Sequence, residues 1–520
     1  MTEAPPAPPR GALGRALDAI ERIGNRLPEP ATIFLLLALA VLAASVVAGA
    51  LGVQVPHPKD GTPIVAESLL TRGNVRRMLT EAVRNFTGFA PLGLVLVAML
   101  GMGVAEGSGL VAAALRGFIA RIPRRGLTAA IVFTGINANM AADAGIVVLP
   151  PLAALLFAAA GRHPLAGVAG AFAGVAGGFS ANLLPTPLDA LLAGLTQSAL
   201  DASRLLPGYS VGILGNWWFL IGSTFALTAV GTWITDAIVE PRLGPWRGGA
   251  GPAADAAPAA APEARESRAL GAALLATVAC LAVFAVLALA PWAPLRLAEA
   301  RGLEAYRPLF ESIVVLVMLL FLVPGLAFGW VSGRIRSDRD VARMMADSMA
   351  SMGTYIVLAF FAAQFVNWFA WSNLAAIVAV WGAQALKAIG LGGPLLIVGL
   401  VLVTAGLNLF TSSASAKWAT MAPLFVPMFV LLGFTPEGTQ MIYRVGDSST
   451  NIVTPLMPYL PFVLATVQRY EPRAGIGTVI SLMIPYSIAF LAMWTALLLG
   501  WDALGWPIGP GVWMHLPKQP

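Results

Sequence analysis

Runs of about twenty apolar residues recur along the chain and constrain its fold more than any other feature. Residues 32–53, 269–291, 309–331 and 475–499 are each apolar over roughly the 20 residues that a helix needs to cross a bilayer. The strands of a membrane β-barrel would instead alternate polar and apolar residues over about ten positions. The sequence therefore predicts an all-α polytopic membrane protein.

Composition and charge agree with this class and disfavour others. Hydrophobic residues make up 58% of the 520 residues and charged residues 11%, whereas soluble domains carry about 25% charged residues. The net charge of +6 comes largely from Arg and Lys in the predicted loops, which favours membrane orientation over nucleic-acid binding. The single cysteine, Cys280, lies in an apolar segment, so we expect no disulfide framework and no cysteine-based metal site.

The first residues set the expected orientation. Four arginines between residues 10 and 26 precede the first apolar run, and positive residues favour the cytoplasmic side. No small-residue cleavage site follows a short apolar region, so the run is expected to be a retained helix and not a signal peptide. We expect a cytoplasmic N-terminal segment at residues 1–31 and a first transmembrane helix at residues 32–53.

The apolar segments together predict nine transmembrane helices and two re-entrant hairpins. Hairpins are expected where polar residues interrupt an apolar segment whose two ends lie on the same side of the membrane. Broken helices are expected where prolines remove helical hydrogen bonds, which is tolerated at depth only beside protein or a wet cavity. The expected order is a first repeat at 88–233 (a span at about 88–118, hairpin 126–161, broken helix 164–200, a span), a cytoplasmic linker at 234–268, two scaffold spans at 269–331, a second repeat at 345–499 (a span, hairpin 393–432, broken helix 438–468, a span) and a C-terminal tail at 500–520.

The two predicted repeats correspond in their polar residues. Asn137 and Asn182 lie 45 positions apart in the first, and Asn408 and Asn451 lie 43 positions apart in the second. The first hairpin is expected to enter from the inside and the second from the outside, so the repeats would be inverted. Inverted repeats are typical of secondary carriers with a site near the bilayer midplane. Chance similarity between apolar segments rich in small residues is the alternative.

Polar residues at the hairpin tips and helix breaks are candidate sodium ligands, because side-chain and unwound backbone oxygens suit a hard cation. One predicted set lies in each repeat: Asn137, Asn139, Asp143, Ser180 and Asn182 in the first, and Asn408, Ser413, Ser449 and Asn451 in the second. Hydrogen bonding between membrane helices is the alternative role. We expect ligation by the asparagines, sodium or protons as the coupling ion, and no other cofactor.

Five further residues are candidates for handling an anion, a ring or a proton. Arg444 and Asp447 are three positions apart, where they would either neutralise each other or bind a carboxylate or a proton beside the helix break. Asp189 ends the first break and suits proton or cation coupling, with an exposed helix cap as the alternative. Lys417 would contact an anion or snorkel to the interface. Trp418 offers a surface for an aromatic ring, or packing.

Six short segments are together specific for one protein family, although each alone is a weak signal. They are Gly103-Val-Ala-Glu-Gly-Ser-Gly-Leu110, Ala141-Ala-Asp-Ala-Gly145, Gly161-Arg-His-Pro-Leu-Ala-Gly167, Leu184-Pro-Thr-Pro-Leu-Asp189, Ser415-Ala-Lys-Trp418 and Tyr443-Arg-Val-Gly-Asp-Ser-Ser-Thr-Asn-Ile-Val-Thr-Pro455. At these segments the sequence resembles the AbgT family, the p-aminobenzoyl-glutamate transporters, over essentially its whole length. The resemblance implies a homodimer in the bacterial inner membrane, with nine spans and two hairpins divided between a transport core and a dimer-forming frame.

The resemblance also implies a substrate and a set of functional residues. It implies transport of p-aminobenzoyl-glutamate and, in some members, export of sulfonamide antimetabolites driven by the proton gradient. It implies substrate-binding or transport roles for the matching residues, which are Asp189, Asn408, Ser415, Trp418, Arg444, Asp447 and Pro455. It leaves the direction of transport open.

We therefore expect an ion-coupled secondary carrier for an anionic aromatic amide. An intramembrane enzyme acting on a lipid or peptide is the chief alternative, but the chain has no His-Glu-x-x-His zinc motif and offers Ser108 no histidine in a span. A channel is a weaker alternative, which saturable and gradient-dependent flux would exclude. The sequence has no ATP-binding loop of the Gly-x-x-x-x-Gly-Lys type, so a pump driven by ATP would need a partner protein that binds ATP.

Overall fold

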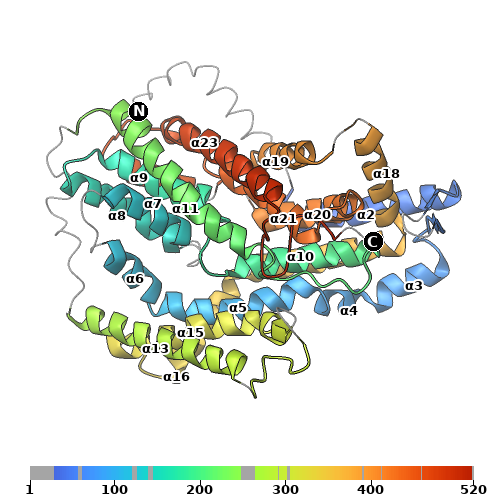
Figure 1. Cartoon of the computed structure of the whole chain (residues 1–520), viewed down its shortest axis with the longest axis horizontal. Helices are drawn as coiled ribbons and strands as arrows, with labels where there is room; N and C mark the ends of the chain where they lie inside the picture. The colour runs from blue at the N-terminus through green and yellow to red at the C-terminus, as the bar shows by residue number, and fades with distance from the viewer. Residues whose placement is uncertain are drawn as a thin grey trace, which may run out of the picture.

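The computed structural model describes residues 28–56, 61–119, 126–138, 144–246, 264–290, 292–300, 305–388, 390, 392–411, 413–457 and 459–517. Nearly all regular structure in these residues is helical (Figure 1). The one sheet among them is an antiparallel pair of short strands, β1 (Gln54–Pro56) and β2 (Pro63–Val65). The helical fold expected from the apolar runs is confirmed.

Within the described residues, eight helical segments are long and apolar enough to cross a membrane. They are α2 (Pro30–Ala50), α5 (Ala90–Gly107), the continuous run of α11 (Trp217–Ile234), η4 (Thr235–Val239) and α12 (Glu240–Leu243), α13 (Ala264–Leu289), α15 (Ile313–Ser332), α17 (Gly353–Trp371), α20 (Ala414–Leu431) and α23 (Ile476–Ala503). Seven overlap segments predicted to cross. The eighth, α20, lies in segment 393–432, for which a hairpin is predicted. The number of spans and the two hairpins therefore stay predictions. The predicted linker at 234–268 is too long, because η4 and α12 continue to Leu243 and α13 begins at Ala264.

The predicted span at 88–118 is wrong in one respect, because it consists of two helices. α5 ends at Gly107, and α6 (Leu110–Ile119) begins after Gly109, whose φ is +79°. A side chain at Gly109 would also collide with Arg334, since its Cβ would lie 1.9 Å from a guanidinium nitrogen. Only glycine adopts this conformation in this space without strain, so the turn is fixed locally.

The segment that opens the second repeat is also divided. α16 (Asp338–Ser351) precedes α17, which ends at Trp371, and α18 (Leu374–Ala388) begins after Asn373 adopts a left-handed φ of 59°. Three shorter helices complete the loops: α3 (Arg72–Thr80), α4 (Ala82–Thr87) and α14 (Arg307–Glu311).

Both predicted broken helices are interrupted. In the first, α9 (Pro164–Phe172) continues into a π-helical turn, η3 (Ala173–Gly177), and a non-helical stretch leads to α10 (Pro187–Ser203). Pro187 opens α10, where its missing N–H leaves no helical bond unmade. In the second, α21 (Pro436–Thr450) is separated from α22 (Leu460–Gln468) by a stretch that contains Pro455.

The first helix of each predicted hairpin packs closely against the broken helix of the same half. α7 (Leu127–Ala138) lies against η3, where a Cβ on Gly135 would come within 3.0 Å of the η3 backbone. α19 (Pro394–Asn408) lies against α21, where a Cβ on Gly446 would come within 2.4 Å of a backbone carbonyl of α19. Glycine is required at both positions because two backbones meet there. The two halves therefore use the same kind of contact between corresponding elements.

Figure 1 shows how these elements are grouped. α7, α8 (Ala144–Ala159) and α9 lie toward one end of the molecule and α2, α18 and α20 toward the other, and α10 runs from the middle of the molecule alongside α20. α10 packs against α5 and α20, while α15 and α16 pack against α5, and α13 packs against α15, along one side. α10 thus lies where the two halves meet, and its first turn carries Asp189.

Candidate functional site

Asp189 and Arg444 form a buried ion pair between the two halves of the chain. Oδ1 of Asp189, in the first turn of α10, lies 2.6 Å from Nη1 of Arg444 on α21. Oδ2 accepts hydrogen bonds from the backbone N–H and the hydroxyl of Thr186 at 2.6 and 2.8 Å. Arg444 also donates through Nη2 to the backbone oxygen of Ser180 at 3.3 Å. The pair therefore ties the first helix break to α21.

This pairing decides between alternatives that the sequence left open. Arg444 and Asp447 share a helix but do not neutralise each other, because each pairs with a residue of another element. Asp189 caps α10, yet it is neither exposed nor isolated, since only 3% of it is accessible and Arg444 contacts it. A buried charge needs such a partner, because removing the partner typically costs about 3–5 kcal/mol.

Lys417 and Asp447 form a second buried ion pair. Nζ of Lys417 lies 2.6 Å from Oδ1 of Asp447 and also donates to Oδ1 of Asn408. The hydroxyl of Tyr443 lies 3.1 Å from the same Asp447 oxygen. Lys417 is buried, so it does not snorkel toward an interface, and its anionic contact is a carboxylate of this chain.

Trp418, on α20, is fully buried and packs against Tyr443 of α21. Its ring stacks on Tyr443, with centroids 4.5 Å apart and planes 29° apart. Nε1 donates to Oγ1 of Thr196 at 2.9 Å, and that hydroxyl lies 2.7 Å from Oε1 of Gln440. Trp418 thereby links α20 to α10 and α21.

The hydrogen bonds continue to a buried carboxylate that the sequence analysis missed. Gln440 donates to Oδ1 of Asn216 at 3.0 Å, and Asn216 donates to the backbone oxygen of Glu437 at 2.8 Å. The Glu437 carboxylate is buried and accepts hydrogen bonds from the Tyr209 hydroxyl at 2.9 Å and the Gly212 N–H at 3.1 Å. In the sequence, Glu437 is typical of an acidic residue in the first turn of a helix, where the helix dipole favours it. That pattern gives no sign of its burial.

The predicted sodium ligands of the first repeat lie around the first helix break. Oδ1 of Asn137, near the end of α7, accepts a backbone N–H of the break at 3.2 Å. Ser180 and Asn182 lie in the break and are buried. Neither polar atom of the Asn182 amide has a hydrogen-bond partner in the described part of the chain. Asn139 and Asp143 lie outside the described residues.

The predicted ligands of the second repeat are brought together only in part. Asn408 donates to Oδ1 of Asn451 at 2.9 Å, and its own Oδ1 accepts from Lys417. Ser413 instead caps α20 by accepting a backbone N–H at 3.3 Å. Ser449 donates to a carbonyl of its own helix at 2.8 Å. The hydrogen bonds of the described residues thus join the two asparagines to each other but do not join the two serines to them.

Ser415 and Pro455 do not take part in the two ion pairs. The Ser415 hydroxyl, in the first turn of α20, lies 3.2 Å from that of Ser413. Pro455 is half-buried in the second break. The preceding residue, Thr454, donates to the carbonyl of Leu409 at 3.1 Å, which ties this break to the turn after α19.

Several buried polar atoms of the site have no hydrogen-bond partner within the described residues. They are Nε of Arg444, Oδ2 of Asp447, Oγ of Ser448 and both polar atoms of Asn182. Buried polar groups nearly always have a partner, so these atoms are candidate contacts for a water molecule, an ion, a ligand or a residue outside the described part of the chain. They lie on α21 and in the first break, beside the two ion pairs.

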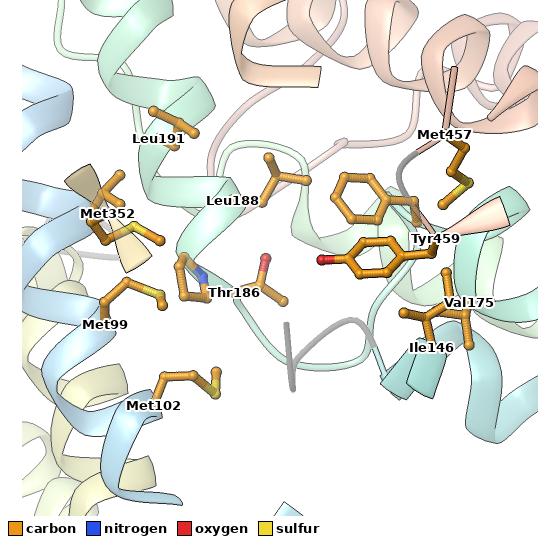
Figure 2. A pocket seen from close by; sticks show the side chains of 13 residues that line it. Met99, Met102, Ile146, Val175, Thr186, Leu188, Leu191, Met352, Met457 and Tyr459 are labelled. Carbon is orange, nitrogen blue, oxygen red and sulfur yellow. The ribbon is translucent and has the colours of Figure 1, made fainter. Parts of the chain in front are cut away.

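A cavity of about 250 Å³ lies between the two helix breaks and α5 (Figure 2). Thr186 lines it from the first break, and Met457 and Tyr459 line it from the second. Three methionines line the opposite side: Met99, Met102 and Met352. The wall is therefore largely apolar, and Thr186 connects it to the Asp189–Arg444 pair.

These features together define a class of protein. The chain has long apolar helices, two interrupted helices near the middle of the fold, and buried charges contributed by both halves. Interrupted membrane helices with charged and amide groups at the break are typical of transporters, whose substrates and ions bind there. The protein is a helical membrane transporter.

Comparison with known proteins identifies the family. The model described as the AbgT putative transporter family matches residues 15–516. The p-aminobenzoyl-glutamate transport protein of Escherichia coli (strain K12) is 37% identical over 503 residues, which is 97% of each chain. The protein belongs to the AbgT transporter family.

Two solved structures are similar throughout the fold. The YdaH transporter of Alcanivorax borkumensis has a TM-score of 0.88 and 45% identity, covering 93% of this chain and 100% of that one. MtrF of Neisseria gonorrhoeae, described as illuminating a class of antimetabolite efflux pumps, has a TM-score of 0.90 and 44% identity, covering 96% of this chain and 100% of that one. The resemblance and the transporter class are confirmed. The enzyme alternative is excluded, because the family and these relatives are transporters.

Proposed function

We propose that the protein is an ion-coupled secondary carrier for p-aminobenzoyl-glutamate and related aromatic amides. The name of the Escherichia coli relative, which matches along nearly the whole chain, supports this substrate. The substrate combines two glutamate carboxylates with an aminobenzoyl ring, so it needs a cationic group and an apolar contact in one place. The buried Arg444 and the neighbouring cavity offer these two features.

The Asp189–Arg444 pair is the observation that carries the proposal. Arginine binds carboxylates through two parallel N–H groups, and Nε of Arg444 has no partner among the described residues. A substrate carboxylate that takes Arg444 leaves Asp189 buried and unpaired, which is costly. A proton or a sodium ion at Asp189 removes this cost. Substrate anion and coupling cation therefore bind together more readily than either binds alone.

We propose sodium or protons as the coupling ion, and the two halves differ as sodium sites. The unpaired amide of Asn182, with Asn137 and Ser180 close to the same break, supports a site in the first half. In the second half, the ammonium of Lys417 already contacts Asn408, so a sodium ion there would have to displace it. The first half is therefore the better candidate.

Export of sulfonamide antimetabolites in exchange for protons is a further part of the proposal. The description of MtrF as one of a class of antimetabolite efflux pumps supports it. A sulfonamide shares the aminophenyl ring but has no glutamate, so it would use the apolar contact without Arg444. Asp189 and Asp447 are the buried carboxylates of the two ion pairs and the candidate proton acceptors.

Purified protein in liposomes tests the proposal. Labelled p-aminobenzoyl-glutamate is supplied while a sodium or a proton gradient is imposed separately, in either direction. We expect accumulation that follows at least one gradient and saturates with substrate concentration. Accumulation that neither gradient alters would contradict ion coupling, and flux that never saturates would indicate a channel.

We also propose that the carrier is a homodimer in the bacterial inner membrane with a cytoplasmic N-terminus. The transporter family supports a membrane location, and the arginines before residue 27 support the orientation. A reporter enzyme that is active only in the cytoplasm, fused to the N-terminus, tests the orientation. Chemical cross-linking in native membranes tests the dimer, which monomeric migration at every cross-linker concentration would contradict.

A further inference from the structure

The cavity between the helix breaks has the size and the wall of a site for one benzene ring. Its volume is about 250 Å³, and an apolar protein cavity of about 150 Å³ is enough to bind benzene. Of its thirteen lining residues, only Thr186 and Tyr459 carry a side-chain oxygen or nitrogen. A substituted phenyl ring therefore fits this space and meets mainly apolar atoms.

Methionines make much of this wall adaptable. Met99, Met102 and Met352 line one side and Met457 lines the other (Figure 2). Methionine is unbranched and polarisable, so it fills irregular gaps and makes favourable contacts between its sulfur and an aromatic ring. Such a wall can close on rings that carry different substituents.

Thr186 connects the cavity to the charged centre. Its side chain lines the cavity, and its hydroxyl and backbone N–H both donate to Asp189, the partner of Arg444. The hydroxyl end of Tyr459 points toward Thr186 from the opposite wall (Figure 2). A ring held in the cavity can therefore direct its acyl substituent toward Arg444.

Trp418 does not provide the ring contact in this conformation. It is 0% exposed, its ring is stacked on Tyr443, and its indole N–H is bonded to Thr196. It is also not among the residues that line the cavity. The flat surface that the sequence offered for a ring is thus already occupied by the protein itself.

We propose that this cavity is the aryl subsite of the carrier. It binds the benzene ring of aminobenzoyl amides and of aminophenyl sulfonamides, while Arg444 binds the carboxylates that only the amides possess. The inference rests on the proposed function and assigns the residues that contact the ring. It explains how one carrier accepts substrates that share a ring but differ in charge.

Enlarging the cavity tests the assignment, because a variant that gains uptake of a larger substrate must be correctly folded. We expect Met352→Ala and Met457→Ala, on opposite walls, to raise the ratio of 4-amino-1-naphthoyl-glutamate uptake to p-aminobenzoyl-glutamate uptake at least tenfold. One extra or missing methylene in an apolar pocket typically changes discrimination by about 10- to 200-fold. Met421→Ala is the matched control. Met421 lines a separate cavity of about 420 Å³ beside α2, so its substitution should leave the ratio unchanged.

Filling the cavity gives a second measurement. Sulfanilamide, which has the ring without the glutamate, should bind Met99→Trp at least tenfold more weakly than the wild-type protein, and Met421→Trp with unchanged affinity. An unchanged uptake ratio in both alanine variants would overturn the aryl subsite, as would equal effects of the Met421 variants. Failure of the wild-type protein to take up p-aminobenzoyl-glutamate would overturn the proposed function instead.

Discussion

The buried cations of the site each pair with a carboxylate from a different element, and neither pair joins neighbours in the sequence. Arg444 and Asp447 lie about one helical turn apart, yet they bind Asp189 and Lys417. The sequence identifies these residues as candidates, because charge is costly in a membrane and is placed there for function. It cannot supply their partners, because partner choice depends on how α10 and α20 pack against α21.

Arg444→Ala should reduce transport of p-aminobenzoyl-glutamate more than transport of a sulfonamide. A hydrogen bond to a charged group contributes about 1.5–3 kcal/mol, or roughly tenfold or more in affinity, and only the amide has the carboxylates. The ratio of the two fluxes in liposomes measures the effect. Arg444→Lys is the matched control, since it keeps the charge but loses the planar fork. Equal losses for both substrates would rule out the carboxylate assignment.

The Asp189–Arg444 pair should also be visible in stability. Asp189→Asn or Arg444→Gln alone leaves one buried charge without its partner and should cost about 3–5 kcal/mol. The double variant removes both charges, so it should lose clearly less than the sum of the single losses. Thermal unfolding of the three variants in one detergent gives the comparison. Losses that add to within about 0.5 kcal/mol would mean that the two residues do not interact.

At the scale of elements, a directional hydrogen-bond chain connects α20, α10 and α21. The indole N–H of Trp418 can only donate, and the backbone oxygen of Glu437 can only accept. These ends fix the orientations of the Gln440 and Asn216 amides, while the Thr196 hydroxyl has two acceptors, Oε1 of Gln440 and the carbonyl of Leu192. The chain therefore fixes both amide orientations and the position of the indole ring.

Thr196→Val should break this chain. The substitution leaves the Trp418 N–H and the Gln440 carbonyl buried without partners, and such groups cost about 1–3 kcal/mol each. We expect a lower unfolding temperature and an altered KM, both restored by Thr196→Ser. Thr224→Val is the control, since within the described residues the buried Thr224 hydroxyl bonds only its own helix. A loss in Thr224→Val as large as in Thr196→Val would show that any buried hydroxyl has this effect.

The helix breaks could be predicted from the sequence, but the number of crossings could not. Proline acts on its own backbone, so Pro185, Pro187 and Pro455 identify both breaks locally. α20 is different, because its 18 residues are apolar enough to cross, and 67% of them are buried inside the protein, against 11% for α13. Hydropathy cannot separate these cases, since lipid and protein interior are similarly apolar. The turn at Gly109 differs, because the glycine-rich stretch Glu106-Gly-Ser-Gly109 is a local turn signal that the predicted span at 88–118 did not take into account.

At the scale of the whole molecule, the last described residues pack against the turn between α20 and α21. Leu516 donates to the carbonyl of Gly433 at 2.8 Å, and Thr435 donates to that of Met514 at 2.9 Å. His515 forms an isolated β-bridge with Phe434. The tail thus covers the turn between α20 and α21. The sequence predicted a tail at 500–520 without this contact, because such docking depends on residues far apart in the chain.

Docking of this tail should depend on pH through His515. Nε2 of His515 lies 3.0 Å from Oδ1 of Asp502, at the end of α23. This hydrogen bond raises the pKa of His515 above its ordinary value of 6.5. Docking therefore favours the charged ring. Its contribution is fully present below about pH 6.5 and is lost as the pH rises through the raised pKa.

Carboxypeptidase digestion of the wild-type protein and of His515→Gln, over about pH 5.5 to 9, measures this dependence. We expect the variant tail to be cleaved faster at low pH and the two rates to converge at high pH. His163→Gln is a control of opposite sign, because burial lowers the pKa of His163 and its protonation destabilises the fold as the pH falls. That variant should unfold less readily in acid without faster cleavage of the tail. A rate difference between wild type and His515→Gln that grows as the pH rises would contradict a docked imidazolium.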